Sequence, residues 1–427
     1  MPISNNKTMN VWIIQIGEPN HIDDEGRARL RRTGILCDFL QNDGHNVTWW
    51  DSTFSHQTKE KRFIGDKLVK ISDLYSIKLI DAGICYSKNI SISRLLHDIL
   101  SSYFIWKKLL LETERPDIIL APYPCNEVCF MSVYFASKFN IPIVVDIRDL
   151  WIDVLKNSFL KRFKLLMPIV LYPYKKSLNY IINNSSSVIG MSEKMLDEVA
   201  EFIAIDEKNF FYSGYQKVKE KDKMSSYNMP SLSNNSINLI FIGALSSQFN
   251  LSYVLETVVK LNRNGILVGL VICGDGDLRK FYQEKSNECD NILFTGWLNK
   301  YDIDYLMGNV DVGIAPYLKT KTFLTNIPNK PIEYISAGLP VLSSVEGELG
   351  NLLRLYGCGL VYKESGKDSL YNIIEILINN KEQIKKMSDN AHFLYDEKFH
   401  PDKIYPTMIS FFEKTIKNYS IKHKEKG

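Results

Sequence analysis

Short apolar runs rich in β-branched residues alternate with segments of helical period along most of this 427-residue chain. The first cycle is a predicted strand over 11–16, a predicted helix over 27–41 and a second strand over 45–50. Strands that are apolar on both faces and alternate with helices are typical of a parallel sheet covered by helices on both sides. The pattern therefore predicts an α/β protein.

The alternation pauses at residues 214–235, which are charged and then rich in Ser and Asn, and it restarts at 238–242. We therefore expect two doubly wound, Rossmann-like domains. The expected parts are an N-terminal domain over 1–215, a linker over 216–236, a second domain over 237–395, and a C-terminal helix over 396–427 that returns to the first domain. Because open α/β sheets bind ligands beyond the carboxyl ends of their strands, we expect the domains to face each other across a cleft.

Composition narrows the class of protein. Lys and Arg number 52 against 49 Asp and Glu, a net charge of +3, which argues against nucleic-acid binding through overall charge. No apolar run approaches the roughly 18 residues needed to span a bilayer, and the first ten residues lack an apolar signal region. The seven cysteines are scattered and odd in number, as expected of reduced thiols. We expect a cytoplasmic protein with no nucleic-acid partner.

Residues 325–344 (TNIPNKPIEYISAGLPVLSS) form the most informative segment. Asn329 can cap a helix whose first turn holds Lys330 and Glu333. Because the N-terminus of a helix carries partial positive charge, its free N–H groups and Lys330 form a natural cradle for a diphosphate. Glu333 can accept hydrogen bonds from sugar hydroxyls. The alternative is a capped surface helix whose acidic residue matches the helix dipole.

A second glycine-containing turn follows a predicted strand at 273–279 (CGDGDLR). Gly274 and Gly276 let a ligand approach the backbone, although a simple tight turn between strand and helix explains them equally well. The dinucleotide fingerprint lacks its third glycine here, and its absence after the first predicted strand argues against a nicotinamide-dependent oxidoreductase. Asp275 and Asp277 match a D-x-D metal motif, but turn residues near a helix start explain them better. We therefore expect no metal and no organic cofactor.

These segments together resemble a known family. Residues 325–344 resemble the donor-site signature of retaining, nucleotide-sugar-dependent glycosyltransferases of the GT-B fold (family 4). Residues 241–245 (FIGAL) are similar to the strand and glycine loop that open the second domain of those enzymes, and 311–317 (DVGIAPY) falls in the family's order. In the first domain, 44–48 (GHNVT) and 148–151 (RDLW) resemble bacterial surface-polysaccharide members. The resemblance implies the GT-B architecture and sugar transfer from a nucleotide sugar, with UDP as the nucleotide.

The resemblance also implies a donor site. Its expected residues are Glu333, Lys330, Asn329, Thr325, Gly243, Gly274, Arg279, Trp297 and Glu18. Thr325 stands where the family has the first Glu of its E-x7-E pair, and a hydroxyl cannot replace that charge. The basic residues that usually follow the first strand of the second domain are also missing, so Lys330, backbone N–H groups and Arg279 would meet the phosphate charge. Glu18 stands at the place of the family's donor loop, where a solvated helix face is the alternative.

Two further expectations concern catalysis and the acceptor. Arg148 and Asp149 end a strand where related enzymes place a His–Asp pair, so Asp149 would orient a sugar and Arg148 would contact phosphate. The alternative is an ion pair that braces the loop. The resemblance implies retention of anomeric configuration, with the departing phosphate taking the acceptor's proton.

As the acceptor, the resemblance implies a polyprenyl-diphosphate-linked saccharide of capsule or O-antigen synthesis. Residues 159–176 interleave basic with bulky apolar side chains and can lie on the inner face of the plasma membrane, or form a core helix with a solvated basic face. Three alternatives to a transferase stay open: a nucleotide-sugar epimerase, a phosphorylase and a non-catalytic scaffold. The Thr325 replacement favours the scaffold, whereas Lys330 and Glu333 oppose it.

Overall fold

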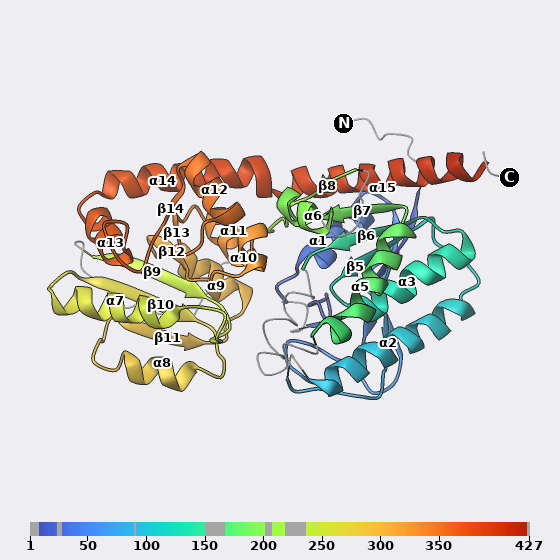
Figure 1. Cartoon of the computed structure of the whole chain (residues 1–427), viewed down its shortest axis with the longest axis horizontal. Coiled ribbons are helices and arrows are strands. Elements are labelled where there is room, and N and C mark those ends of the chain that lie inside the picture. The colour runs from blue at the N-terminus through green and yellow to red at the C-terminus, as the bar shows by residue number, and fades with distance from the viewer. Residues whose placement is uncertain are drawn as a thin grey trace. The chain divides into compact units, whose positions relative to one another are not determined.

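The computed structural model describes residues 8–23, 28–88, 91–149, 167–200, 207–217 and 236–424. The chain divides into two compact units (Figure 1): residues 1–212 with 404–427, and residues 213–403. Each unit is built on a sheet of mainly parallel strands covered by helices. The expected linker over 216–236 lies almost wholly outside the described residues. The α/β prediction with two Rossmann-like halves is confirmed.

The sheet of the first unit has the strand order β3-β4-β2-β1-β5-β6-β7-β8. Its strands are β1 (Asn10–Ile14), β2 (Asn46–Ser52), β3 (Lys67–Lys70), β4 (Tyr75–Ile80), β5 (Ile118–Tyr123), β6 (Ile143–Ile147), β7 (Ser187–Gly190) and β8 (Asn209–Phe210). The β3–β4 pair is antiparallel and the other described pairs are parallel. Its helices are α1 (Arg32–Asn42), α2 (Ile92–Leu111), α3 (Asn126–Phe139), α5 (Met167–Asn183), α6 (Glu193–Ala200) and α15 (Pro401–Lys424), which belongs to this unit from Ile404 onward.

Two hydrophobic cores flank this first sheet because successive residues of a strand point to opposite faces. Val11 and Ile13 of β1 pack in one core with residues of α1 and α15, including Tyr405. Trp12 and Ile14 pack in the other core with residues of α2, α3, α5 and α6. The C-terminal helix therefore completes one face of the first unit.

The sheet of the second unit has the strand order β11-β10-β9-β12-β13-β14 and its described pairs are all parallel. Its strands are β9 (Ile237–Ile242), β10 (Val268–Cys273), β11 (Ile292–Gly296), β12 (Val312–Ala315), β13 (Val341–Ser343) and β14 (Gly359–Val361). Its helices are α7 (Leu251–Arg263), α8 (Arg279–Lys285), α9 (Lys300–Met307), α10 (Lys321–Thr325), α11 (Asn329–Ser336), α12 (Gly347–Tyr356), α13 (Leu370–Ile378) and α14 (Lys381–Leu394), followed by a π-helical turn at Tyr395–Phe399.

Both sheets contain a point at which the strand order reverses. In the first unit β1 lies between β2 and β5, and in the second unit β9 lies between β10 and β12. Loops that leave the carboxyl ends of such neighbouring strands diverge and leave room for a ligand. A ligand site is therefore expected at these loops. Among the helices of the described residues, none combines the length and hydropathy required to cross a bilayer.

Candidate functional site

In the second unit, two glycine loops meet beyond the carboxyl ends of β9 and β10. The N–H of Gly243 donates to the carbonyl oxygen of Cys273 at 2.8 Å. Gly274 has a φ of +143°, and a Cβ at this residue would lie 2.0 Å from the Gly243 carbonyl oxygen. No side chain fits at that distance, so the contact between the loops itself requires glycine at 274.

Lys330 lies directly beside this pair of loops. A Cβ at Gly243 would lie 2.8 Å from Lys330 Cε, and Lys330 Nζ lies 5.6 Å from the centroid of the Phe249 ring. Lys330 is in the first turn of α11, so the positive end of this helix and a cationic side chain meet at the loop after β9. Such an arrangement favours an anion.

The start of α11 differs from the sequence prediction. The residue in the N-cap position is Pro328, whose side chain makes no capping hydrogen bond. Asn329 is the first helical residue and is exposed, so the prediction that it caps the helix is wrong. Pro328 fits this position because its fixed φ, here −63°, suits the entry to a helix. The side chain of the N-cap residue therefore leaves the first N–H groups of α11 available to another partner.

The two positions of the expected carboxylate pair lie on different helices. Glu333 is buried in α11, and Thr325 is the last residue of α10. The Thr325 hydroxyl donates to the carbonyl oxygen of Lys321 at 3.1 Å. Thr325 therefore already uses its hydroxyl in a helical contact, whereas Glu333 is held by the helix that carries Lys330.

Arg279 and Trp297 lie at the same edge of the second sheet. Arg279 Nη1 donates to Asp275 Oδ2 at 2.8 Å and would lie 3.2 Å from a Cβ at Gly296, the last residue of β11. The backbone hydrogen bond from Gly276, followed by the bond from Arg279, lowers the pKa of Asp275. Trp297 follows β11 and is largely exposed. Both side chains thus add to the carboxyl edge that Gly243, Gly274 and Lys330 form.

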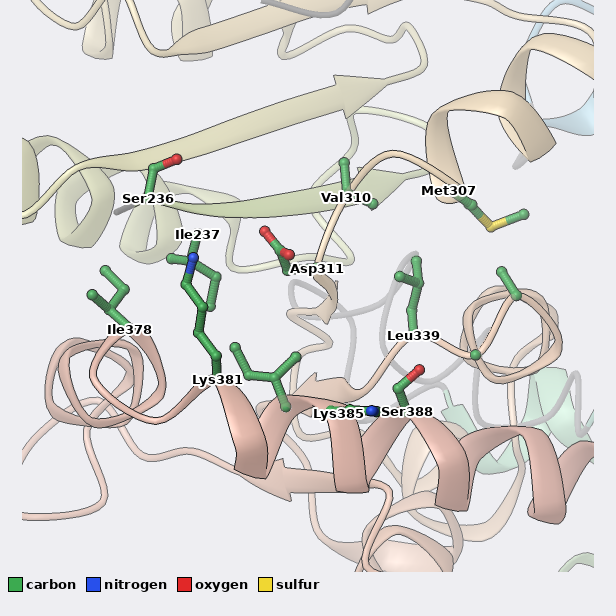
Figure 2. Close-up of a pocket in the computed structure, with 14 residues that line it drawn as sticks. Ser236, Ile237, Met307, Val310, Asp311, Leu339, Ile378, Lys381, Lys385 and Ser388 are labelled. Carbon is green, nitrogen blue, oxygen red and sulfur yellow. The ribbon is translucent and has the colours of Figure 1, made fainter. Parts of the chain in front are cut away.

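A pocket of about 340 Å³ lies at the opposite edge of this sheet (Figure 2). Its lining includes Ser236 before β9, Asp311 before β12, and Lys381 and Lys385 of α14. Asp311 Oδ2 already accepts a hydrogen bond from the Asn238 N–H at 2.7 Å. Because parallel sheets bind ligands at the carboxyl ends of their strands, we do not assign the donor to this pocket.

In the first unit, Arg148 belongs to a buried ion-pair network. Its Nη1 donates to Glu18 Oε1 at 2.5 Å and to the Thr33 hydroxyl at 2.9 Å, and its Nε donates to Asp146 Oδ2 at 2.8 Å. Arg32 Nε donates to the same Asp146 oxygen at 2.8 Å. Burial alone would raise the pKa of Asp146, but Arg32 and Arg148 lower it overall. The network fixes the loop after β1, which carries Glu18, to the end of β6.

Asp149 follows directly and is half-buried. The structure thus places both predicted catalytic residues, Arg148 and Asp149, after the carboxyl end of β6. Within the predicted basic segment 159–176, side chains are described only for 171–176, which belong to α5.

A second polar cluster at this edge has no counterpart in the predicted site. His56 Nδ1 lies 2.5 Å from the Tyr86 hydroxyl and 3.4 Å from Lys59 Nζ. Lys59 Nζ and Arg94 Cζ lie 4.9 and 5.8 Å from the centroid of the Tyr86 ring. Burial, followed by the charges of Lys59 and Arg94, lowers the pKa of His56 to about 3. Burial, followed by the charge of Arg94, lowers the pKa of Lys59 to about 8.

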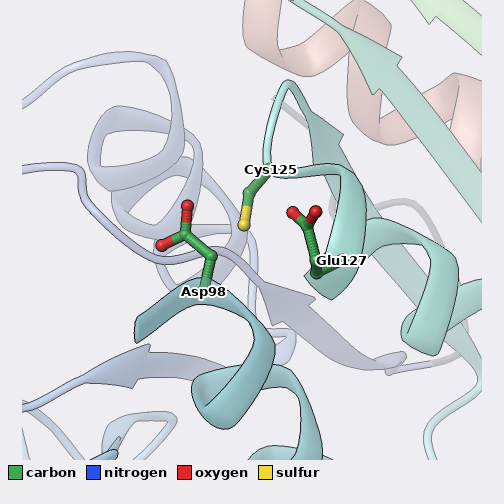
Figure 3. Close-up of side chains that lie close together, drawn as sticks. All are labelled: Asp98, Cys125 and Glu127. Carbon is green, nitrogen blue, oxygen red and sulfur yellow. The ribbon is translucent and has the colours of Figure 1, made fainter. Parts of the chain in front are cut away.

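Three acidic groups lie next to this cluster: Asp98, Cys125 and Glu127 (Figure 3). One potential ligand atom from each lies within 4.8 Å of the others. Burial, then the charges of Asp98 and Glu127, raises the pKa of Cys125 well above its usual value, so the thiol keeps its proton. Arg94 Nε lies 3.7 Å from Asp98 Oδ2 and offsets its charge. A cation would compete with that proton and with Arg94, so the group suits the binding of hydroxyls better.

Only the positions after strands could have pointed to these residues. His56 follows the strand predicted at 45–50 within the segment STFSH, and Tyr86 opens the segment YSKNIS. Nothing in the sequence itself brings these two residues, 30 positions apart, together.

Comparison with known proteins agrees with this architecture. Residues 229–392 match the family described as "Glycosyl transferases group 1". An uncharacterized glycosyltransferase of Methanocaldococcus jannaschii is 21% identical over 301 residues, which cover 69% of this chain and 74% of the relative.

Three solved structures are similar over nearly their full length. Sucrose-phosphate synthase from Thermosynechococcus elongatus gives a TM-score of 0.73 at 12% identity, with 95% of this chain and 98% of that chain covered. Anabaena HepE in complex with UDP gives a TM-score of 0.61 at 13% identity, with 95% of this chain and 100% of that chain covered. The catalytic domain of starch synthase IV from Arabidopsis thaliana, bound to ADP and acarbose, gives a TM-score of 0.67 at 10% identity. The match covers 96% of this chain and 100% of that chain.

At these identities the structural likeness establishes the fold. The family match over residues 229–392 lies within the second unit. This unit also contains the loops after β9 and β10, Lys330 and Glu333. The chain therefore has the GT-B fold, and its residues 229–392 match the glycosyl transferases group 1 family.

Proposed function

We propose that this protein is a glycosyltransferase that moves a sugar from a nucleoside diphosphate sugar, with UDP as the nucleotide, to a saccharide acceptor. The observation that carries the proposal is the position of Lys330, whose side chain lies beside Gly243 in the first turn of α11. Structures of the same fold were solved with UDP in Anabaena HepE and with ADP in starch synthase IV, which supports a nucleotide donor.

Each residue of the proposed donor site has a role that follows from its chemistry. The N–H groups of α11 and the Lys330 ammonium hold the diphosphate, on which negative charge develops as the sugar leaves. Arg279 adds a second cation at the loops after β10 and β11. Glu333, on the same helix as Lys330, accepts hydrogen bonds from hydroxyls of the donor sugar. Backbone atoms at Gly296 and Trp297 read the base. These groups meet the charge without a metal or an organic cofactor.

The reaction proceeds with retention of anomeric configuration, as in family 4. The bond between the anomeric carbon and the β-phosphate oxygen breaks, and the acceptor oxygen forms its bond on the same face of the sugar. The departing phosphate takes the acceptor's proton, so the atoms balance without a protein base. In the first unit, Asp149 orients the acceptor sugar, and Arg148 holds Glu18 in place through their ion pair.

The acceptor binds to the carboxyl edge of the first unit. We propose a polyprenyl-diphosphate-linked saccharide of surface-polysaccharide synthesis, such as a capsule or O-antigen, at the inner face of the plasma membrane. Lys59 and Arg94, which flank the Tyr86 ring, suit an anionic group of this acceptor. Asp98 and Glu127 suit its hydroxyls.

Calorimetric titration with UDP, GDP, ADP and dTDP tests the donor site, with Lys330→Ala beside the parent. A charge-assisted hydrogen bond to phosphate corresponds to a loss of about 10- to 100-fold in affinity. The matched control is Lys386→Ala, which removes an exposed lysine of α14 in the same unit. If no diphosphate binds, or if both variants bind like the parent, the proposed donor site is wrong. Binding without turnover of any nucleotide sugar would instead support a scaffold.

A further inference from the structure

The exposed side of α2 is apolar, the reverse of an ordinary surface helix. Its exposed residues recur every three or four positions on one side of the helix: Ile92, Leu95, Leu96, Ile99, Tyr103, Lys107 and Leu111. Only Lys107 is charged, while Ile92 and Leu111 are 71% and 75% exposed. Helices on the surface of a soluble protein usually place polar residues on this side. A continuous exposed apolar stripe marks a surface that binds something.

The stripe extends over neighbouring helices. α3 packs against both α2 and α5, so the three helices form one layer over the first sheet. Phe130 and Tyr134 of α3 and Tyr172 of α5 are exposed in this layer. We call the exposed residues of these three helices the α2–α3–α5 face.

The charges of this face have one sign. Its exposed charged residues are Lys107, Lys138, Lys175 and Lys176, and the described, exposed residues of the three helices include no Asp or Glu. Two of the lysines lie over aromatic rings of the same face. Lys107 Nζ is 4.7 Å from the Tyr103 ring centroid, and Lys176 Nζ is 5.3 Å from that of Tyr172. Cations beside aromatic rings and aliphatic side chains suit the boundary between lipid headgroups and acyl chains.

We propose that the α2–α3–α5 face binds the surface of an anionic lipid bilayer. The apolar residues of α2 enter the headgroup boundary, and the four lysines attract anionic headgroups. A water-soluble protein partner would not require an exposed face free of carboxylates. The inference depends on exposure and charge and holds whether or not the protein transfers sugars.

The same helix connects this surface to the proposed acceptor site. The side of α2 that faces the unit carries buried His97 and Asp98, while the opposite side carries the apolar stripe. If the proposed function holds, a lipid-linked acceptor lies in the same membrane that the face binds. The polar cluster at Tyr86 and Asp98 then lies one helix away from the lipid.

Vesicle co-sedimentation tests the proposal directly. The full chain is mixed with vesicles of phosphatidylcholine alone, or of equal parts phosphatidylcholine and phosphatidylglycerol. We expect stronger binding to the anionic vesicles and a decrease in that binding as salt is added. Leu96→Asn with Ile99→Asn should reduce the partition coefficient by about tenfold or more. Lys175→Gln with Lys176→Gln should reduce binding to anionic vesicles only, by about fivefold for each lysine.

The matched control makes equivalent changes in the second unit. Leu355 of α12 and Ile376 of α13 are 77% and 56% exposed, and Leu355→Asn with Ile376→Asn should leave vesicle binding unchanged. Absence of binding by the parent, or equal loss in the control, would overturn the proposal. So would a dimer, detected by analytical ultracentrifugation, that Ile99→Asn dissociates while the parent binds no vesicles. The face would then bind a second copy of the chain. Because binding is measured without substrates, failure here would leave the proposed function untouched.

Discussion

The side chain of Lys330 occupies the space beside Gly243 that any larger residue would fill. A Cβ at Gly243 would lie 2.8 Å from Lys330 Cε and 3.0 Å from Phe241 Cζ. The glycine at the end of β9 therefore sets the position of the cation at the start of α11. This relationship gives a way to perturb the donor site without removing any of its charged groups.

Gly243→Ala should displace Lys330 and weaken binding of a nucleoside diphosphate by about tenfold, since one charge-assisted contact is lost. The effect on stability should be moderate, because Lys330 Cε is the far end of a flexible side chain and only the Phe241 ring, at 3.0 Å, must shift within the core. Titration calorimetry and thermal unfolding measure the two effects separately. Gly308→Ala, in a helical conformation with its nearest neighbour at 3.4 Å, is the control. Equal affinities of the Gly243 and Gly308 variants would contradict the placement of Lys330 in the donor site.

Gly274→Ala should instead unfold or severely destabilise the second unit. Its Cβ would lie 2.0 Å from a backbone oxygen of Gly243, at a φ of +143°, so a strand or loop must move. Gly265→Ala is the control that has backbone strain without a steric clash. Gly265 also has a positive φ, +78°, but no atom lies within 4 Å of the added carbon. Gly265→Ala should lower the free energy of unfolding by only about 1–2 kcal/mol. Chemical denaturation of both variants checks this, and similar costs at the two positions would show that the loop contact is unimportant.

The elements of the second unit could largely be predicted from the sequence. β9 and β10 are largely apolar runs that each end just before a glycine, a pattern typical of strands buried on both faces. The cap of α11 could not be predicted in the same way. Asn329 has the usual capping side chain, but Pro328 before it fits the cap position through its fixed φ, so the helix begins one residue earlier than a cap at Asn329 implies.

The first unit shows why a site is harder to predict than a fold. The buried side of helix α2 cannot be identified from its apolar residues, because these occur on both sides of the helix. Ile105 and Leu109 are buried, whereas Leu96 and Ile99 are exposed. The His56–Tyr86 contact joins loops after β2 and β4, and only the order of strands in the sheet brings them together. Local sequence carries no such long-range information.

The Glu18–Arg148 pair allows a test of the buried network. Both side chains are nearly excluded from solvent, and Arg148 also donates to Asp146. Arg148→Met should destabilise the protein by about 3–5 kcal/mol, because it takes the cation away from buried Glu18. Glu18→Gln should cost less stability, because Arg148 keeps its ion pair with Asp146. The double variant should cost less than the sum of the two. A double-mutant cycle measured by urea unfolding gives the coupling, and simple additivity would contradict a direct ion pair.

The pKa of His56 predicts a specific pH dependence of stability. In the folded protein, burial and the charges of Lys59 and Arg94 lower its pKa to about 3, from the ordinary histidine value of 6.5. Between these values the unfolded chain binds a proton that the folded chain does not, so the free energy of unfolding falls as the pH falls from about 6.5 towards 3. His56→Gln removes this contribution. The parent should therefore lose stability relative to the variant over that range and gain nothing above pH 7.

Other groups titrate in the same range, so the comparison must be made as a difference. Burial raises the pKa of Asp51 to about 6, which adds the opposite slope, with stability that is lost as the pH rises from 3.8 to 6. This term is present in the parent and the variant alike and cancels when their unfolding free energies are subtracted at each pH. Urea titrations from pH 4 to pH 7 provide the difference. A parent–variant difference that does not change with pH would show that His56 has the same pKa in the folded and unfolded protein. The contacts that Lys59 and Arg94 make around Tyr86 would then not lower the pKa of His56.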